Sequence, residues 1–499
     1  MHEKDTAGLV STGVAGLDDV IRGGLVPHRL YLVEGTPGSG KTTLSLQFLL
    51  AGVARGERVM YVTLSETTDE LASAAASHGW NLAGIDIMEL EASDASLRTE
   101  SQYTMYHPSE VELAETTRLM LTRAEEIKPV RMVIDSLSEL RLLAQNPLRF
   151  RRQILALKQF FSRQQCTVLL ADDRSAAEGD ADLFSIAHGV ISLERRATEY
   201  GSLRRQLQVV KLRGRQFREG WHDLRITTGG LTVYPRLISA EHHTDFAPEV
   251  LSSDVPELDQ LMGGGLTRGT STLIMGPAGA GKSSVATRYV CAACRRGQKV
   301  AVFLFEELMA TYLARSMGLG MDLRPWIDAG QLSVRQIDPA ELSPGEFAQA
   351  VRDVVEQGNV GMVVIDTLNG YLNAMPSEKL LMIHLHELLS YLGQRGVTTL
   401  LVTAQHGLIG SHMGTPIDTS YLADGVILLR YFESAGELRQ AISVVKKRTG
   451  THERTIREMS LSSQGVKIGQ PLRALRGVLS GIPVPDETSQ GGGSLRSNA

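Results

Sequence analysis

Short apolar runs alternate with longer amphipathic segments along most of the 499-residue chain. The runs RLYLV, RVMYVTL, VRMVID and TVLLA in the first half have the counterparts STLIM, KVAVFLF, GMVVID and TTLLVT in the second. Continuous Val, Ile and Leu runs between helical segments are typical of parallel strands that are buried on both faces. The pattern therefore predicts an α/β fold, in which helices flank a mostly parallel sheet, and it predicts that this fold occurs twice.

The second half of the chain repeats the first at a constant shift. The shift of 241 residues that takes Gly35 to Gly276 also takes Val59 to Val300 and Glu66 to Glu307. A chance motif would not carry its surroundings with it, so the repeat indicates a duplicated domain. We expect a first domain at 1–240, a polar linker at 241–247, a second domain at 248–484 and a flexible Gly- and Ser-rich tail at 485–499.

The composition narrows the class of protein. A hydrophobic fraction of 42% and a charged fraction of 21% are those of a folded globular chain, and the net charge of −5 argues against nucleic-acid binding as the main activity. No apolar run reaches the roughly 18–20 residues of a membrane span. The chain has three cysteines, which fits a cytoplasmic protein. Cys291 and Cys294 form a C-x-x-C pair, for which we expect packing within a buried helix rather than a zinc or redox site.

Each half carries a phosphate-binding loop with the pattern G-x-x-x-x-G-K-[ST], placed between an apolar run and a helical segment. Its glycines allow successive backbone N–H groups to point at phosphate oxygens, while the lysine meets the β- and γ-phosphates of ATP. The residues predicted to bind ATP are Gly35, Thr36, Pro37, Gly38, Ser39, Gly40, Lys41, Thr42 and Thr43, with Gly276, Pro277, Ala278, Gly279, Ala280, Gly281, Lys282, Ser283 and Ser284 in the second half.

Each half also has an acid at the end of a later apolar run. Asp135 ends VRMVID and Asp366 ends GMVVID, so each carboxylate is expected at the carboxyl end of a buried strand, where ligands collect in open α/β sheets. Together with the hydroxyl groups of Thr42 and Ser283, these two carboxylates are the predicted ligands of Mg²⁺.

A second set of acids follows the strand after each phosphate-binding helix. Glu66 ends YVTLSE, and Glu306 and Glu307 end VFLFEE. We expect this strand beside the phosphate-loop strand, which would bring the carboxylates to the γ-phosphate as catalytic groups. The alternative is that these glutamates only cap strand ends in solvent.

Two Lys-x-Arg pairs occur near the end of the halves. Lys211 and Arg213, and likewise Lys446 and Arg448, are two residues apart and would share one face of a strand. Such pairs suit a transferring phosphoryl group and often come from a neighbouring subunit. A basic edge strand that discourages aggregation is an equal alternative.

These features together resemble the KaiC family of tandem RecA-like P-loop ATPases, which includes the cyanobacterial clock kinase. The resemblance runs from STGVAGLDDVIRGGL to LRGVLSGIP. It implies two RecA-like domains, a homohexamer of two stacked rings and ATP bound between subunits. It further implies a slow ATPase in the first ring, a serine/threonine autokinase with Glu306 as base in the second, and the Lys-x-Arg pairs as trans-acting fingers. Partners would include KaiB-like proteins or response-regulator and histidine-kinase signalling proteins.

The chain departs from the family pattern at several positions. Ser420 and Tyr421 stand where the family has Ser-Thr, and we expect phosphorylation chiefly on Ser420 because the tyrosine oxygen lies farther from the backbone. The first half has Ser65 in place of the first glutamate, and His188 stands opposite Asp424. The first ring is therefore expected to hydrolyse ATP slowly or to serve as an ATP-held assembly ring.

Two other functions remain as alternatives. One is a nucleotide-gated scaffold in which ATP controls assembly and partner binding without phosphorylation. The other is a ring-shaped DNA motor, because the RecA-like fold supports several functions. Against the motor, the nearest basic and aromatic stretch is RGRQFREGW, which nucleotide contacts explain as readily.

Overall fold

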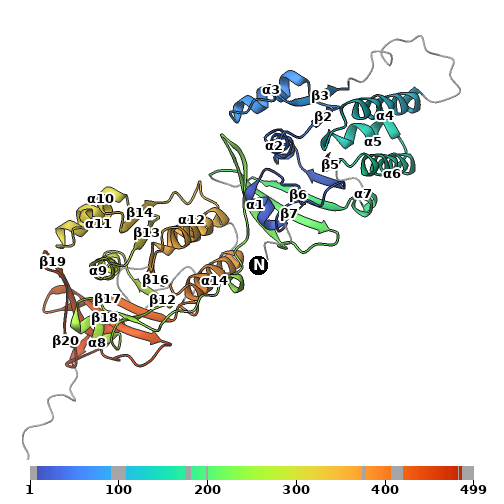
Figure 1. Ribbon diagram of the computed structural model, residues 1–499. Coiled ribbons are helices and arrows are strands. Elements are labelled where there is room, and N and C mark those ends of the chain that lie inside the picture. Colours follow the sequence, from blue (N-terminus) through green and yellow to red (C-terminus); the bar gives the residue numbers. More distant parts are fainter. Residues whose placement is uncertain are drawn as a thin grey trace, which may run out of the picture. The chain divides into compact units, whose positions relative to one another are not determined.

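The computed structural model describes residues 8–90, 108–174, 181–197, 201–373, 378–405, 420–480 and 483–485. The chain divides into two compact units, Met1–Arg236 and Leu237–Ala499 (Figure 1). Most of the expected tail, from residue 486 onward, lies outside the described residues.

The first unit is built on a nine-stranded sheet with the order β3-β2-β4-β5-β1-β6-β7-β8-β9. Its strands are β1 (Leu30–Gly35), β2 (Val59–Thr63), β3 (Ile85–Glu89), β4 (Arg131–Asp135), β5 (Thr167–Asp173), β6 (Gly189–Arg196), β7 (Arg204–Leu212), β8 (Trp221–Thr227) and β9 (Gly230–Tyr234). Its helices are α1 (Ala15–Val20), α2 (Lys41–Val53), α3 (Thr68–Ser77), α4 (Pro108–Ile127), α5 (Leu137–Ala144), α6 (Pro147–Arg163) and α7 (Ala181–Ile186). The strands from β3 to β6 are parallel, and β7, β8 and β9 follow as antiparallel neighbours.

The second unit repeats this topology with the order β14-β13-β15-β16-β12-β17-β18-β19-β20. Its main strands are β12 (Ser271–Gly276), β13 (Val300–Leu304), β14 (Leu332–Gln336), β15 (Met362–Asp366), β16 (Thr398–Ala404), β17 (Gly425–Ser434), β18 (Glu437–Lys447), β19 (Arg457–Ser462) and β20 (Gly465–Pro471). Its α-helices are α8 (Pro256–Leu261), α9 (Lys282–Arg295), α10 (Met309–Gly318), α11 (Arg324–Asp328), α12 (Pro344–Glu356), α13 (Leu368–Asn373) and α14 (Glu378–Gln394). Short pieces complete it: β10 (Val250–Leu251), β11 (Leu266–Thr267), β21 (Leu475–Arg476), β22 (Val484–Pro485), η3 (Ser239–Glu241) and η4 (Val478–Ser480).

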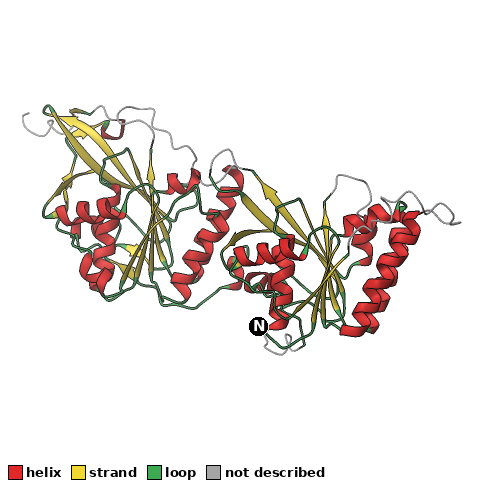
Figure 2. Ribbon diagram, turned by 90° about the horizontal axis from the view of Figure 1, so that it is seen from above, coloured by secondary structure: helices red, strands yellow, loops and turns green. Residues whose placement is uncertain are grey.

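Helices cover both faces of each sheet, so each unit has two apolar layers (Figure 2). In the first unit, α1, α2 and α3 pack on one face and α4 to α7 on the other. In the second unit, α8 to α11 cover one face and α12 to α14 the other. The central strands are therefore buried throughout, as their continuous apolar runs predict. The predicted fold, two tandem mostly parallel α/β domains of the RecA-like type, is confirmed.

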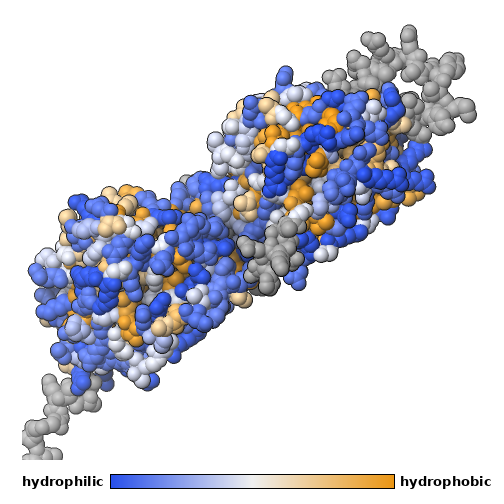
Figure 3. All heavy atoms as spheres, in the orientation of Figure 1, coloured by the Kyte–Doolittle hydropathy of each residue, from blue (hydrophilic) through white to orange (hydrophobic). Residues whose placement is uncertain are grey.

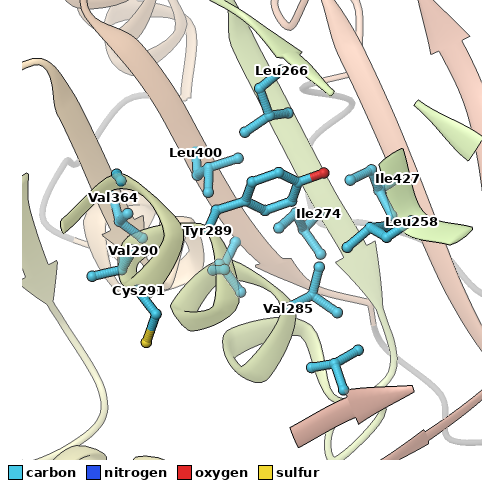
Figure 4. Close-up of a cluster of buried hydrophobic side chains, with 14 of the residues drawn as sticks. Leu258, Leu266, Ile274, Val285, Tyr289, Val290, Cys291, Val364, Leu400 and Ile427 are labelled. Atoms are coloured by element: carbon cyan, nitrogen blue, oxygen red, sulfur yellow. The ribbon is translucent and has the colours of Figure 1, made fainter. Parts of the chain in front are cut away.

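The cysteine pair of the second unit belongs to its core. Cys291 and Cys294 are free thiols in α9, and they lie in the apolar cluster that surrounds Tyr289 (Figure 4). Burial raises the pKa of the Cys291 thiol to about 11. These thiols are thus buried packing groups, as expected for this segment.

The end of the expected first domain, 1–240, and the expected linker, 241–247, both make contacts with the second unit. Leu237 packs into a core cluster of that unit, and the Ser239 N–H donates to Glu387 of α14 at 3.2 Å. The Thr244 N–H donates to the Gln394 carbonyl at the end of the same helix at 3.1 Å. The chain thus joins the second unit's helical layer before its first strand begins.

Hydrophilic residues dominate the face of each unit that Figure 3 presents, with apolar residues in separate patches. None of the helices formed by the described residues is long and apolar enough to cross a bilayer.

One buried charge distinguishes the first core from the second. Arg131 in β4 is fully buried, and its guanidinium donates to the Glu57 carboxylate and to the carbonyl oxygens of Ser11 and Phe48 at 2.7 and 3.0 Å. Strand register places Met362 at the same position of the second sheet, because Val59 pairs with Arg131 as Val300 pairs with Met362. The fold itself therefore does not require a cation here.

We expect Arg131→Met to lower the unfolding free energy of the first unit by about 2–4 kcal/mol, because Glu57 and two carbonyl groups lose their partner. The double variant Arg131→Met with Glu57→Gln places in the first unit the two residues that the second unit has at these positions, Met362 and Gln298. It should recover at least half of the loss. Denaturant titration of the nucleotide-free chain measures both, and an unchanged midpoint for Arg131→Met would contradict the expectation.

Candidate functional site

The carboxyl ends of the parallel strands gather the predicted phosphate-binding residues at one edge of each sheet. The loop after β1 enters α2 at Lys41, and the loop after β12 enters α9 at Lys282. Gly40 and Gly281 precede these helices with φ of 112° and 92°, a left-handed conformation that L side chains rarely adopt. Both loops therefore present backbone N–H groups at a helix N-terminus, the arrangement that binds phosphate.

In the first unit the loop lysine is buried and fully engaged. Lys41 is 8% exposed, and its Nζ donates to the Gly35 carbonyl at 2.9 Å and the Thr36 carbonyl at 3.3 Å. It also forms an ion pair with Asp173, at the end of β5, at 2.6 Å. The lysine thus lies at the mouth of the loop, with a carboxylate in contact.

The predicted metal ligands of the first unit meet beside this lysine. Thr42 donates to Asp135 Oδ2 at 3.3 Å, and Tyr61 of β2 donates to the same oxygen at 2.6 Å. Burial raises the pKa of Asp135, and the hydrogen bond from Tyr61 opposes the shift. A desolvated carboxylate beside a hydroxyl group provides the hard oxygen ligands that Mg²⁺ prefers.

Sequence reasoning missed Tyr61 and Asp173. The rule that identified Asp135, an acid at the end of an apolar run, also applies to TVLLADD, so Asp173 could have been found. Tyr61 lies inside a buried strand, and nothing in its sequence context marks it.

In the second unit the same elements line a cavity of about 800 Å³, whose walls include Lys282, Ser283 and Asp366. Lys282 Nζ donates to the Pro277 carbonyl at 2.8 Å. Burial raises the pKa of Asp366 to about 6, and a hydrogen bond with Ser283 opposes this shift. Burial also lowers the pKa of Lys282, which the charges of Asp366 and Glu306 partly offset. The structure thus brings the loop and the predicted metal ligands together here as well.

Magnesium fits both groups of residues. No set of three His, Cys, Asp or Glu side chains within the described ranges is close enough to hold a metal ion by itself. Mg²⁺ commonly binds one or two carboxylates together with substrate phosphates and water, so one acid and one hydroxyl per site suffice. Asp135 with Thr42, and Asp366 with Ser283, are those pairs.

Contrary to expectation, the strands that precede the predicted catalytic glutamates do not lie beside the phosphate-loop strands. The strand β2 is not beside β1, because β4 and β5 lie between them, and the same holds for β13 and β12. Chain order alone does not give strand order, since later strands fill the positions that the first crossover skips. Glu66 nevertheless lies near Asp135 and Lys41: burial raises its pKa, as does the charge of Asp135, and Lys41 opposes the shift.

The two acids of the second unit differ in their surroundings. Glu307 forms two hydrogen bonds with Arg315 of α10, at 3.1 and 2.8 Å. Glu306 lines the cavity, and its charge acts on Lys282. Glu66 corresponds by the 241-residue shift to Glu307, but the Arg315 position is Ala74 in the first half. The corresponding glutamates Glu66 and Glu307 therefore have different partners in the two halves.

A further difference lies over the phosphate-binding loops. In the first unit Arg205 donates to the Gly38 carbonyl at 3.2 Å, and it is paired across the sheet with Arg195. In the second unit Gln440 and Tyr431 occupy this place, with contacts of 3.4 Å to the Gly279 and Ala278 carbonyls. The first loop thus has two additional cations from its own chain.

The Lys-x-Arg pairs lie at the opposite edge of the sheets from the loops. Because β12 and β17 are parallel and Thr272 pairs with Gly425, the start of β17 lies beside the start of β12. Lys446 pairs with Val426, which lies beside Leu273, whereas the loop follows Gly276, about 10 Å farther along β12. The first unit repeats this, with Lys211 beside Val190 of β6. In both, a β-bulge separates the lysine from the regular ladder.

Both pairs bind the segment that precedes the neighbouring strand. Lys211 and Arg213 donate to the carbonyls of Phe184 and Ser185. Lys446 donates to the Ser420 and Ala423 carbonyls at 2.9 and 2.7 Å.

Ser420 and Tyr421 are thereby fixed beside the basic pair. Arg448 donates to the Tyr421 carbonyl at 2.9 Å and pairs with Asp424 at 3.3 Å. Ser420 is half-buried, whereas the Tyr421 side chain is 56% exposed. The predicted acceptor and the predicted fingers thus form one group at the edge remote from the loop of their own unit.

The replacement at position 188 changes this edge in the first unit. The N–H groups of His188 and Asp424 donate to the equivalent carbonyls of Leu30 and Ser271, so the two residues correspond. Asp424 accepts from Ser271 and pairs with Arg448, whereas the His188 ring packs edge-on against Tyr31 at 5.8 Å. Burial lowers the pKa of His188, and so do nearby cations that include Arg29 and Arg213. The first edge is therefore the more basic one.

Both units match the same family of known proteins. The family model described as "ATPase: KaiC" matches residues 10–238 and again residues 251–473. The chain is similar to circadian clock protein KaiC3 of Synechocystis, with 26% identity over 496 residues that cover 97% of this chain and 96% of that protein. It is also similar to circadian clock oscillator protein KaiC of Synechococcus elongatus, with 27% identity over 478 residues that cover 95% and 91%.

We expect Glu306→Gln and Glu307→Gln to have different effects. Loss of the Glu306 carboxylate should slow phosphate loss from ATP in the second unit by about 100-fold, the scale of a general base. Loss of Glu307 should mainly free Arg315 and lower thermal stability. Phosphate release, measured in a Lys41→Ala background that silences the first loop, together with melting temperature, separates the two. Equal turnover of the Glu306 variant and its parent would contradict the assignment.

Proposed function

The chain belongs to the KaiC ATPase family, and we propose that it is a Mg²⁺-dependent ATPase whose second unit phosphorylates itself on Ser420 within a homohexameric double ring. Nucleotide binding and ATPase activity are properties of the family. The proposal adds the kinase step, the ring and the residues that perform each role.

One observation carries the proposal: Ser420, Lys446 and Arg448 lie at the sheet edge opposite the loop of their own unit. A γ-phosphate held at Lys282 of the same chain is therefore too far from Ser420. A ring in which this edge of one protomer meets the loop edge of the next brings acceptor, fingers and nucleotide together. Chains of this family would then need a neighbour to complete each pocket.

The residues of the second unit divide the transfer reaction between two protomers. One protomer supplies the loop with Lys282, the Mg²⁺ ligands Ser283 and Asp366, and Glu306. The adjoining protomer supplies Ser420, whose Oγ attacks the γ-phosphorus as Glu306 accepts its proton and ADP leaves. Ser283 and Asp366 would hold a Mg²⁺ ion, which would supply positive charge that offsets the charge of the phosphates. Lys446 and Arg448 stabilise the charge on the transferring group.

The first unit would hydrolyse ATP to ADP and phosphate with water as the nucleophile. Glu66 orients or deprotonates that water, and burial already raises the pKa of this carboxyl, which favours proton acceptance near neutral pH. Lys211 and Arg213 complete the pocket of the neighbouring protomer. Signalling proteins of the KaiB, response-regulator or histidine-kinase type are the proposed partners of the assembled ring.

Mixing two inactive variants tests transfer between protomers. Glu306→Gln keeps the acceptor but lacks the base, and Ser420→Ala keeps the base but lacks the acceptor. Each alone should incorporate little γ-labelled phosphate, whereas subunits mixed before assembly should label the Glu306→Gln chain at Ser420. Peptide mapping by mass spectrometry reads this out, with Tyr421→Phe as the control that should retain labelling.

Two results would contradict the proposal. Full labelling of the Ser420→Ala chain would show another acceptor, and label on Tyr421 would identify it. No label on the unmodified chain, with ATP turnover retained, would favour the nucleotide-gated scaffold.

A further inference from the structure

The contact between Lys41 and Asp173 has no counterpart in the second unit. Gly35 pairs with Asp173 across β1 and β5, and Gly276 pairs in the same register with Ala404 across β12 and β16. The position next to the loop lysine is therefore acidic in one half and apolar in the other. We propose that Asp173 is a positioning residue that competes with nucleotide phosphate for Lys41 and weakens nucleotide binding in the first half. This inference rests on the nucleotide site proposed for that half.

The neighbouring residue fixes the direction of the Asp173 side chain. Asp172 is 3% exposed, and its carboxylate accepts from Ser138 at 3.0 Å and Arg141 at 2.5 Å. Because successive side chains of a strand point to opposite faces, Asp173 is turned to the other side, toward the phosphate-binding loop. Its backbone N–H donates to Ser138 at 3.4 Å, which holds the strand end in place.

The ion pair with Asp173 occupies the Lys41 ammonium group, which a nucleotide phosphate would also contact. Lys41 Nζ already donates to two loop carbonyls, and its third contact is Asp173 at 2.6 Å. An ammonium group has three N–H donors, so a phosphate oxygen gains a direct bond only if one of these contacts is given up. In the second unit Lys282 has no carboxylate within ion-pair distance among the residues that the structure describes, and it contacts the Pro277 carbonyl.

The remaining charges of the pocket add to the competition. Glu66 and Asp135 lie near enough for their charges to act on one another, and Asp173 acts on both. A nucleotide that enters therefore meets three carboxylates around one lysine. A Mg²⁺ ion held by Thr42 and Asp135 would offset the charge of Asp135, whereas the charge of Asp173 would repel the phosphates. Arg205 and Arg195 over the same loop act in the opposite direction. The proposed effect is therefore that of Asp173 alone, which lowers the affinity that this loop would have without it.

Equilibrium binding of a fluorescent ADP analogue with Mg²⁺ tests the inference on the full chain with Lys282→Ala, which leaves the first loop intact. Asp173→Ala and Asp173→Asn should each lower the dissociation constant about three- to tenfold, as expected for removal of a half-exposed competing charge. The control Asp86→Asn removes a carboxylate that pairs with Arg123 at the far strand and should leave binding unchanged. Disrupted folding cannot mimic tighter binding.

The reverse change provides a second measurement. With Lys41→Ala silencing the first loop, Ala404→Asp should weaken binding at the second loop by a similar factor. Binding by the Lys282→Ala chain that is unchanged or weakened by Asp173→Ala overturns the inference while the nucleotide site stands. Absence of binding both in that chain and in its Asp173→Ala derivative overturns the inference and the proposed site together.

Discussion

A parallel sheet has two chemically different edges, and this asymmetry governs the arrangement of every candidate residue in the chain. Strand ends deliver the phosphate loop, Asp135 and Glu66 to one edge, and their counterparts follow in the second unit. The Lys-x-Arg pairs, where the antiparallel strands β7 and β18 end, lie with Ser420 beside the starts of the parallel strands, at the other edge. In the proposed function, phosphate chemistry that needs both sets unites two copies of the chain. Oligomerisation is thus a geometric condition of the proposed activity.

The two units have the same strand order but differ in several charged residues. Arg131, Arg205 and Asp173 of the first unit correspond in register to Met362, Gln440 and Ala404 of the second. The first unit has His188 where the second has Asp424, so the sheet edge that holds Lys211 and Arg213 lacks this carboxylate and is more basic. The exchanges at Arg205 and Asp173 change the charge beside the phosphate-binding loop without altering strand order. Exchanges of this kind are how a duplicated domain can acquire a second role on the same fold.

Much of this fold could be predicted from the sequence, because buried parallel strands require continuous apolar runs and phosphate loops require their glycines. The acids at strand ends followed from the same rule for Asp135 and Asp366. The order of the strands in the sheet could not be predicted, because the sequence does not say how many strand positions the connection from β1 to β2 skips. The hydrogen bond of Tyr61 and the contact of Asp173 with Lys41 join segments far apart in the chain, and spacing carries no information on such contacts. The ion pair of Glu307 with Arg315 spans only eight residues, but it depends on how the chain turns from β13 into α10.

The central claim is that basic side chains of one protomer complete the nucleotide pocket of the next. The mass of the full chain in solution, measured by light scattering during size-exclusion chromatography, tests it most directly. The account predicts a hexamer with Mg²⁺ and a non-hydrolysable ATP analogue, smaller species without nucleotide, and loss of the hexamer when Lys211, Arg213, Lys446 and Arg448 are all replaced by alanine. A chain that stays monomeric with nucleotide bound would contradict it.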